Sequence, residues 1–351
     1  MRGVSQLIRA AIVGASGYTG GELVRLLHCH PQVELVALSS RTYGGQDIGS
    51  VFSSLKGLNY RFKEMNPEQI ASEADVVFVA APHGVAMQFA PAVVEAGKKL
   101  IDLGTDFRFR DVALYEQWYK IQHSCPHLLA EAVYGLPEVH RLEIAKARVI
   151  GNPGCYPTSI ILALAPLLEA RAVADDLIIA DSKSGVSGAG RKSDTAYSFC
   201  ELTGEVHPYS VLNHRHTPEI EQELSLLAGR KIKAVFTPHL VPTVRGIIST
   251  VYVRIKPGYT RESIRGLYER RYEGEPFVRL LDEGHYPSTK AVTGSNYCDI
   301  SVDFDESTSL AIVVAAIDNL GKGASSQAVQ CMNIMFGLEE TAGIAGLPLF
   351  P

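Results

Sequence analysis

Short apolar runs alternate with amphipathic segments through the first 150 residues of the chain. After the first run comes a glycine turn, and then a segment in which Leu23, Leu26 and Leu27 share one helical face. A second helix is expected over residues 84–96. The strand-like runs are residues 7–13, 33–40, 75–82 and 98–104. Strands that alternate with helices at this rhythm predict an α/β domain with a parallel, doubly wound sheet.

The pattern changes after Gly151. Strand-like runs become longer, contain more β-branched residues and are separated by loops; they cover residues 177–185, 235–255 and 311–321. This part of the chain predicts an α+β domain with a mixed or antiparallel sheet. The closing segment 323–338 has apolar residues at helical spacing and predicts a helix.

Composition narrows the class of protein. The chain has 351 residues, 46% of them hydrophobic and 20% charged, which is typical of a folded soluble enzyme with two domains. A formal charge of -5 argues against nucleic acid as a partner, and no apolar run approaches the roughly 20 residues that cross a bilayer. Six cysteines without CxxC pairs predict neither a disulfide framework nor a zinc site, so a cytoplasmic location is expected.

The glycine turn after the first strand has the spacing of a nucleotide-binding loop. Gly14, Gly17 and Gly20 form GxxGxxG between a strand and a helix, where glycines let the backbone approach a pyrophosphate at the helix N-terminus. The alternative is a tight structural turn without a ligand.

The end of the second predicted strand indicates which dinucleotide is bound. An NAD enzyme usually carries Asp or Glu here, but this chain has Ser39, Ser40 and Arg41. A guanidinium suits a ribose 2′-phosphate, so NADP is preferred over NAD. The alternative is that Arg41 is an ordinary solvated loop residue.

Cys155 stands in a rigid bend. Pro153 and Gly154 precede it, Pro157 follows, and an apolar helix is predicted directly afterwards. A helix N-terminus lowers the pKa of a thiol, which makes Cys155 a candidate nucleophile, with a buried core cysteine as the alternative. The other five cysteines are interpreted as small buried hydrophobic residues.

The nearest candidate base lies in the stretch HRHTPEI. Thr217 and Pro218 resemble an N-cap followed by proline at the first helical position, so His214 and His216 precede the helix in a segment expected to be extended, with both rings on one side. Acid–base chemistry ranks first, a structural hydrogen bond second and a metal site last, because no further ligands follow at a recognisable spacing.

Two loops are rich in groups that bind anions. Residues 182–194 combine serine hydroxyls and glycines with Lys183 and Arg191, and a second loop offers Asp106 and Arg108. Such loops bind phosphate or carboxylate, although solvated surface loops have the same composition.

Taken in order, seven motifs resemble one enzyme family. They are GASGYTGGELVRLL, DLGTDFRFRD, GNPGCYPTS, SKSGVSGAGR, HRHTPEI, PHLVPTVRGI and DNLGKGASSQAVQ. Together they are similar to the N-acetyl-gamma-glutamyl-phosphate reductases of arginine biosynthesis, which belong with the aspartate-semialdehyde dehydrogenases. The resemblance runs from about residue 8 to 349, and its one small departure is Ser159, where the signature usually has Gly or Ala.

The resemblance implies a Rossmann domain for NADP over residues 1–150, completed by a C-terminal helix over 324–351, and a catalytic and oligomerisation domain over 151–323. It places the catalytic role on Cys155 and on His216 or His214, with His216 favoured. The implied cofactor residues are Gly14, Ser16, Gly17, Tyr18, Thr19, Gly20, Ser39, Ser40, Arg41, Pro82, Ser187, Gly188, Asn319 and Gly323, with Lys322 beside them. The implied substrate residues are Arg108, Asn152, Ser184, Gly185, Arg191, Glu219 and Arg245. No metal is implied.

The implied reaction is the NADPH-dependent reduction of an acyl phosphate to an aldehyde through a cysteine thioester, in a homodimer or homotetramer. One alternative is the related reductase of lysine biosynthesis, which acts on a carrier-protein-linked aminoadipyl phosphate. Aspartate-semialdehyde dehydrogenase is disfavoured, because the residues of the cysteine motif and of HRHTPEI are more similar to the glutamyl-phosphate enzymes. From other classes, a non-catalytic NADP-binding sensor and a metal-dependent hydrolase built on the HxH pair remain as alternatives.

Overall fold

The computed structural model describes residues 7–191 and 194–349, which form two compact units. Among the described residues, the first unit contains 7–153 together with Ala324–Ala345, and the second contains Gly154–Gly323 and 346–349. Each unit is built on its own seven-stranded sheet. No helix in the described ranges is long and apolar enough to cross a membrane.

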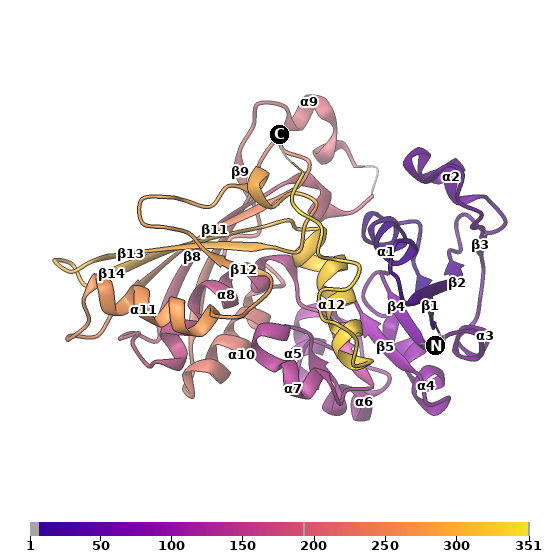
Figure 1. The fold of residues 1–351 in the computed structure, drawn as a ribbon, viewed down its shortest axis with the longest axis horizontal. Coiled ribbons are helices and arrows are strands. Elements are labelled where there is room, and N and C mark those ends of the chain that lie inside the picture. Colours follow the sequence, from indigo (N-terminus) through magenta and orange to yellow (C-terminus); the bar gives the residue numbers. More distant parts are fainter. Residues whose placement is uncertain (1–6, 192–193, 350–351) are drawn as a thin grey trace, which may run out of the picture. The chain divides into compact units, whose positions relative to one another are not determined.

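The first unit is a parallel α/β sheet in the order β3-β2-β1-β4-β5-β7-β6 (Figure 1). Its strands are β1 (Ile8–Val13), β2 (Val33–Ser39), β3 (Phe62–Lys63), β4 (Val76–Val79), β5 (Lys99–Asp102), β6 (Val133–Tyr134) and β7 (Val149–Gly151). The main helices are α1 (Tyr18–His28), α3 (Pro67–Glu73), α4 (Ala86–Glu95), α5 (Val112–Tyr119), α6 (Pro126–Glu131), α7 (Pro137–Ile144) and α12 (Ser326–Met335), with a short α2 (Ile48–Val51). The predicted doubly wound sheet is confirmed.

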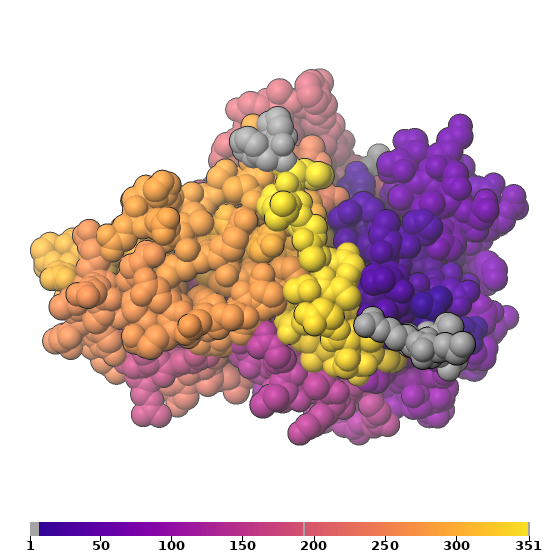
Figure 2. All heavy atoms as spheres, viewed as in Figure 1, coloured from indigo at the N-terminus to yellow at the C-terminus, as the bar shows by residue number. Residues whose placement is uncertain are grey.

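The C-terminal segment Ala324–Ala345 belongs to the first unit, and the helix in it is shorter than the expected helix over 324–351. α12 ends at Met335, and Gly337 adopts a φ of 65°, which stops the helix. α12 packs on α1 and α7, and Figure 2 shows this segment, in yellow, against the indigo and magenta parts of the same unit. Further on, Leu349 belongs to the second unit, where its amide bonds to the Thr293 carbonyl at 2.8 Å.

The second unit has a mixed sheet in the order β12-β13-β14-β11-β8-β10-β9. Its strands are β8 (Leu177–Ser184), β9 (His207–Pro208), β10 (Lys233–Leu240), β11 (Ile247–Arg254), β12 (Val278–Leu280), β13 (Cys298–Asp305) and β14 (Leu310–Ile317). Its helices are α8 (Cys155–Glu169), α9 (Phe199–Leu202), α10 (Thr217–Ala228) and α11 (Arg261–Tyr272). The predicted α+β domain with a mixed sheet is confirmed.

Helix α8 is the centre of the second unit. It contacts β11 and β14 on the sheet and is flanked by α10 and α11, which lie on the same side of the sheet in Figure 1. Apolar residues occupy all faces of the helix, and all of its residues except the first and the last are buried. A helix that is apolar all round has to be buried in this way, and its burial fixes the position of Cys155 at its first turn.

Candidate active site

Cys155 begins α8, directly after the N-cap residue Gly154. Its side chain is half-buried and forms no disulfide. No acidic residue lies in the first turn of α8, so the positive end of the helix dipole acts on the thiol without an opposing charge from the same turn. Such a position stabilises a thiolate, as the sequence predicts.

The turn before Cys155 is held by a buried carboxylate. The Gly154 amide donates to Glu219 Oε1 at 2.7 Å, and Glu219, in the first turn of α10, has no exposed surface. Glu219 was expected at the substrate; this contact gives its carboxylate a role in fixing the turn. The bond links the N-termini of α8 and α10. It thereby holds the cysteine motif next to the histidine motif.

Two glycines allow the groups around Cys155 to come close. A Cβ added at Gly154 would lie 2.6 Å from His216 Nε2, and one added at Gly323 would lie 2.8 Å from the Cys155 Cβ. Both positions therefore exclude a side chain. The imidazole of His216 and the 321–323 segment both pack directly at the cysteine turn.

The histidine pair is brought together differently from the prediction. Residues 211–216 form turns, with a φ of 60° at Leu212, so the segment is not extended. His216 itself is the N-cap of α10 and Thr217 is its first helical residue, one position earlier than expected. The rings of His214 and His216 nevertheless meet, with centroids 4.8 Å apart.

The two histidines have different environments. Burial, and secondarily the charge of Arg215, lowers the pKa of His214 to about 4, so this ring is neutral at pH 7. Its Nδ1 accepts the His216 amide at 3.1 Å, and the rings of Tyr156, Tyr209 and Phe236 lie 5.3 to 5.6 Å away. His214 therefore holds the loop that presents His216.

A cavity of about 330 Å³ opens at Cys155, a volume that suits a small metabolite. Its lining is Cys155, Tyr156, Ser184, Gly185, Gly188, Ala189, Ala196, Tyr197, His207, Tyr209, His214, His216 and Leu240. Six of these residues were predicted from the sequence: the cysteine, both histidines and three residues of the 182–194 loop. Its tyrosines and His207 were not, because nothing local distinguishes them from core or surface residues.

Two of the unpredicted tyrosines form a hydrogen-bonded pair. Tyr156 and Tyr209 join through their hydroxyl groups at 3.0 Å, and the Tyr156 hydroxyl also donates to the His239 carbonyl at 3.4 Å. Burial raises the pKa of Tyr209 to about 12 and that of Tyr156 well above its usual value. Both phenols therefore remain protonated at neutral pH and present polar groups at the edge of the cavity.

The 182–194 loop is tied to the segment after β14. Ser187 Oγ accepts from Asn319 Nδ2 at 2.9 Å, and Asn319 Oδ1 accepts the Gly246 amide at 2.8 Å. Ser184 Oγ donates to the Gly185 carbonyl, while Arg191 is exposed. The loop is thus anchored at its first half, at the cavity wall.

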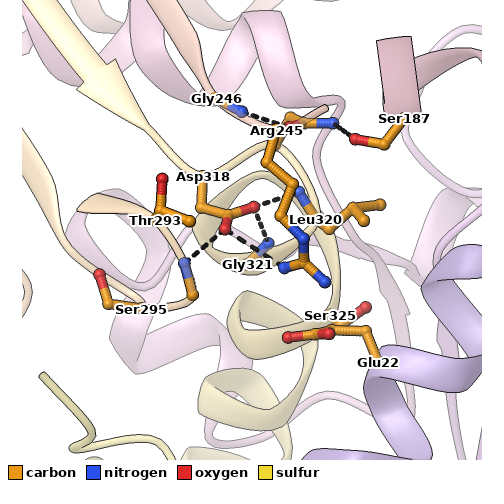
Figure 3. Close-up of polar contacts among 12 residues, drawn as sticks. Glu22, Ser187, Arg245, Gly246, Thr293, Ser295, Asp318, Leu320, Gly321 and Ser325 are labelled. Atoms are coloured by element: carbon orange, nitrogen blue, oxygen red, sulfur yellow. Dashed lines mark hydrogen bonds and ion pairs between the residues drawn. The ribbon is translucent and has the colours of Figure 1, made fainter. Parts of the chain in front are cut away.

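Arg245 is held by Asp318, a residue that the sequence analysis missed. Arg245 Nη1 lies 3.2 Å from Asp318 Oδ2, and the fully buried carboxylate also accepts the amides of Gly294, Leu320 and Gly321 at 2.6 to 3.0 Å. Figure 3 shows this carboxylate at the centre of the converging donors. One carboxylate thereby orients the predicted substrate arginine and shapes the turn that leads to Gly323. Lys322 in this turn is fully buried, with Nζ 5.9 Å from the Phe277 ring centroid.

The glycine loop of the first unit fits a dinucleotide phosphate. Gly14 has a φ of 79°, and a Cβ there would lie 2.3 Å from the Ala80 carbonyl oxygen; one at Gly20 would lie 2.5 Å from the Gly14 oxygen. α1 begins with Gly17 as N-cap, no capping side chain and no acidic residue in its first turn. Its open N-terminus, with Tyr18 and Thr19, is suited to an anion.

The end of β2 has the groups that were expected beside the ribose. Ser16 Oγ and Ser40 Oγ are 3.0 Å apart, and Arg41 is exposed directly after the strand. Ser39 is buried, and its carbonyl accepts the Gly14 amide at 3.0 Å, so it supports the loop through its backbone. Pro82 is exposed after β4.

Arg108 and Asn152 are buried in the first unit, where each donates to main-chain carbonyls. Arg108 donates to the carbonyls of Asn152 and Leu103 at 2.7 and 3.2 Å, and Asn152 Nδ2 donates to the Ala324 carbonyl at 3.1 Å. These contacts fix the chain at the end of β7. The sequence predicted Arg108 and Asn152 only as substrate-binding residues and did not indicate this structural role.

Two bacterial relatives match the chain along nearly its whole length. N-acetyl-gamma-glutamyl-phosphate reductase of Geobacter metallireducens is 52% identical over 347 residues, covering 98% of this chain and 100% of the relative. The protein of the same name from Pelotomaculum thermopropionicum is 52% identical over 345 residues, covering 98% and 99%. The chain belongs to the N-acetyl-gamma-glutamyl-phosphate reductase family.

Domain models agree with this family and with the two sheets. The semialdehyde dehydrogenase NAD binding domain matches residues 9–147, and the semialdehyde dehydrogenase dimerisation domain matches residues 155–319. This chain also has the fold of aspartate semialdehyde dehydrogenase II from Vibrio cholerae, with a TM-score of 0.73, 20% identity, and coverage of 95% of this chain and 99% of that one. Aspartate semialdehyde dehydrogenase from Candida albicans, in a crystal structure with NADP, gives a TM-score of 0.70 at 17% identity. The match covers 94% of this chain and 99% of that one.

Proposed function

We propose that this chain reduces N-acetyl-L-glutamyl 5-phosphate to N-acetyl-L-glutamate 5-semialdehyde and phosphate, with NADPH as the electron donor, in arginine biosynthesis. The observation that carries the proposal is the half-buried Cys155 at the N-terminus of α8, beside His216 and open to a cavity of about 330 Å³. The substrate is taken from the names of the relatives.

Cys155 supplies the nucleophile. Its thiolate attacks the acyl carbon, the carbon–oxygen bond to phosphate breaks, and phosphate leaves with the electron pair, so that a thioester remains on the protein. The α8 N-terminus stabilises the thiolate before the attack and again when the carbon–sulfur bond breaks at the end of the reaction. Covalent capture divides one difficult reduction into two easier steps.

His216 supplies the proton. A nicotinamide cofactor, when bound, would supply the hydride that the thioester carbon accepts. His216 then protonates the developing oxyanion and takes the proton back as the thiohemiacetal releases the aldehyde. His216 is assigned this role over His214, because His214, with its pKa of about 4, carries almost no proton at neutral pH.

The remaining predicted residues bind the two ligands. Ser184, Gly185, Arg191 and Arg245 are proposed to receive the phosphate and the substrate carboxylate, with Arg245 oriented by Asp318. The Gly14–Gly20 loop is proposed to hold the pyrophosphate and Arg41 the 2′-phosphate of NADP, whereas Asn319 and Gly323 border the nicotinamide.

The second unit is proposed to form a homodimer, in keeping with its match to a dimerisation domain. Burial alternates along β8, so that one face of the sheet packs on the helices and the other carries Leu177 and Ile179, which are 51% and 46% exposed. Val235, Ile248 and Ile312 are only partly buried on the neighbouring strands of the same face. The same face also carries Asp181, Lys183 and His239. A partly apolar sheet face of this kind is suited to a second copy of the chain.

A reducing cytoplasm suits this enzyme. Cys29 and Cys200 are exposed free thiols, and Cys155 has to remain reduced to act as a nucleophile.

The test is the reverse reaction. Purified protein, N-acetyl-glutamate semialdehyde, NADP and phosphate should produce NADPH absorbance at 340 nm, and Cys155→Ser should abolish it. His216→Gln should lower kcat by roughly 10²- to 10⁴-fold while NADP still binds. Turnover that persists in Cys155→Ser would refute the thioester. Cofactor binding without wild-type turnover would favour the carrier-linked aminoadipyl substrate or a sensor.

A further inference from the structure

A second cavity lies at the other end of α8. Its volume is about 240 Å³, and it is lined by Leu168, Arg171, Val173, Ala228, Gly229, Arg230 and Lys256, from the C-terminal ends of α8 and α10 and the end of β11. Since an α-helix rises 1.5 Å per residue, Leu168 is about 20 Å along the helix from Cys155. This cavity is therefore separate from the candidate active site.

The charge of this cavity is positive. Three of its seven lining residues are cations, and none is acidic. Of the carboxylates next to it in sequence, Asp176 pairs with Arg230 at 2.6 Å and Asp175 with Arg254 at 3.4 Å. In the part of the chain that the structure describes, Arg171 and Lys256 form no ion pair, so their two charges remain uncompensated within the protein.

Arg171 occupies a backbone position where glycine is usual. Its φ is 55°, and it follows α8 in a Schellman turn, in which the Arg171 amide bonds to the Leu168 carbonyl at 2.9 Å and the Ala172 amide to the Leu167 carbonyl at 2.9 Å. At the end of α10 the corresponding left-handed residue is Gly229. The backbone itself satisfies these carbonyls at the end of α8, so capping them does not explain the guanidinium.

Backbone contacts hold Arg171, Arg230 and Lys256 next to the same cavity. The Lys256 amide donates to the Ala172 carbonyl at 2.9 Å, and Val173 pairs with Ile255 in a β-bridge. Arg230 Nη2 donates to the Val173 carbonyl at 3.0 Å. The segment after α8 is thereby fixed between the end of β11 and the end of α10, and the three side chains share one cavity.

We propose that this cavity is a binding site for a small dianion, with Arg171 and Lys256 as the donors and Arg230 as a supporting charge. Guanidinium and ammonium groups form strong, charge-assisted hydrogen bonds to phosphate, sulfate and carboxylate oxygens. The apolar side chains of Leu168 and Val173 are placed to contact the body of an organic dianion. The volume admits a phosphate ion or a short dicarboxylate.

The probe is selenate, whose selenium gives an anomalous signal in crystals of the full chain. Soaks over a range of concentrations should produce a peak in this cavity, within hydrogen-bonding distance of both Arg171 and Lys256. Arg171→Gly removes the charge at a position that favours glycine, and Lys256→Gln removes the other charge from the surface. Each should raise the concentration for half occupancy at least about tenfold, whereas Lys231→Gln, an exposed cation outside the lining, should leave it unchanged.

Competition then identifies the chemistry of the ligand. Inorganic phosphate and succinate are added in separate soaks at fixed selenate; displacement by phosphate alone indicates a tetrahedral anion, and displacement by succinate as well indicates a general dianion site. Chloride at the same ionic strength should not displace selenate. Absence of the peak in the wild type, or wild-type occupancy in both Arg171→Gly and Lys256→Gln, would overturn the proposal, and both outcomes are independent of catalytic activity.

Discussion

At the scale of single residues, Gly154 is the position where one methyl group should matter most. Its Cβ would lie 2.6 Å from His216 Nε2, so Gly154→Ala must displace the imidazole or the cysteine turn. A shift of about 1 Å at reacting groups lowers a rate roughly 10²-fold. We therefore expect Gly154→Ala to lower kcat by roughly 10²-fold. Gly346→Ala, which meets no atom within 4 Å, is the matched control. Wild-type kcat in Gly154→Ala would show that His216 does not act from this position.

His214 should make the stability of the protein depend on pH. Its pKa is lowered from 6.5 to about 4, so between these values the unfolded chain binds more protons than the folded one. The stability due to neutral His214 is therefore full above pH 6.5 and is lost as the pH falls towards 4. The free energies of unfolding of the wild type and of His214→Asn, obtained from thermal unfolding, should differ by a few kcal/mol above pH 6.5. This difference should shrink as the pH falls towards 4. A gap that is constant with pH would contradict the burial of a neutral ring.

Arg41 should determine the choice of cofactor. If its guanidinium binds the 2′-phosphate, Arg41→Ser raises the KM for NADPH at least about tenfold and leaves the KM for NADH nearly unchanged, since only the former has that phosphate. Steady-state kinetics with both cofactors measures this. Equal changes for the two cofactors would indicate a structural role for Arg41.

Sequence reasoning could identify candidate residues whose backbone surroundings are distinctive. The bend around Cys155 and the glycine loop could be recognised because glycine and proline dictate backbone shape in their immediate surroundings. Asp318 and Tyr209 could not, because their importance depends on partners distant in sequence, such as Arg245 and Tyr156. For Glu219 the sequence indicated importance, but only the structure shows its bond to the Gly154 amide.

At the scale of elements, the turn after β14 depends on one carboxylate. Asp318 accepts three backbone amides and Arg245, so Asp318→Ala removes the acceptor of three amides and the carboxylate partner of a partly exposed arginine. We expect a loss of about 3–5 kcal/mol in the free energy of unfolding of the second unit. Asp318→Asn retains one acceptor oxygen and should cost less. Chemical denaturation measures both, and Glu283→Ala on the surface is the control; a loss below 1 kcal/mol for Asp318→Ala would exclude this role.

The element pattern was predictable where hydrophobic periodicity is strong and less so at boundaries. The strands β1, β2, β4 and β5 of the first unit and the helix α8 follow directly from their apolar runs, whereas the short strands β3, β6 and β7 were not predicted. The helix expected to reach residue 351 ends at Met335, because Gly337 takes a left-handed conformation that the apolar spacing before it does not reveal. The HRH segment was expected to be extended, yet it turns, since tertiary contacts of the His214 ring outweigh local alternation.

At the scale of the whole molecule, the exposed face of the second sheet should decide the oligomeric state. Ile179 on β8 is 46% exposed, and a charge there would be buried against the second copy in the proposed dimer. Ile179→Asp should therefore shift the protein to monomers, measured by light scattering after size-exclusion chromatography at several concentrations. Leu142→Asp replaces a residue that is 78% exposed on α7 and should leave the assembly unchanged. A wild-type monomer would refute the proposed dimer, and an Ile179→Asp protein with wild-type mass would show that the interface lies elsewhere. Because Cys155, His216 and their cavity all lie within one copy of the second unit, dissociation should lower activity only as far as it destabilises this sheet.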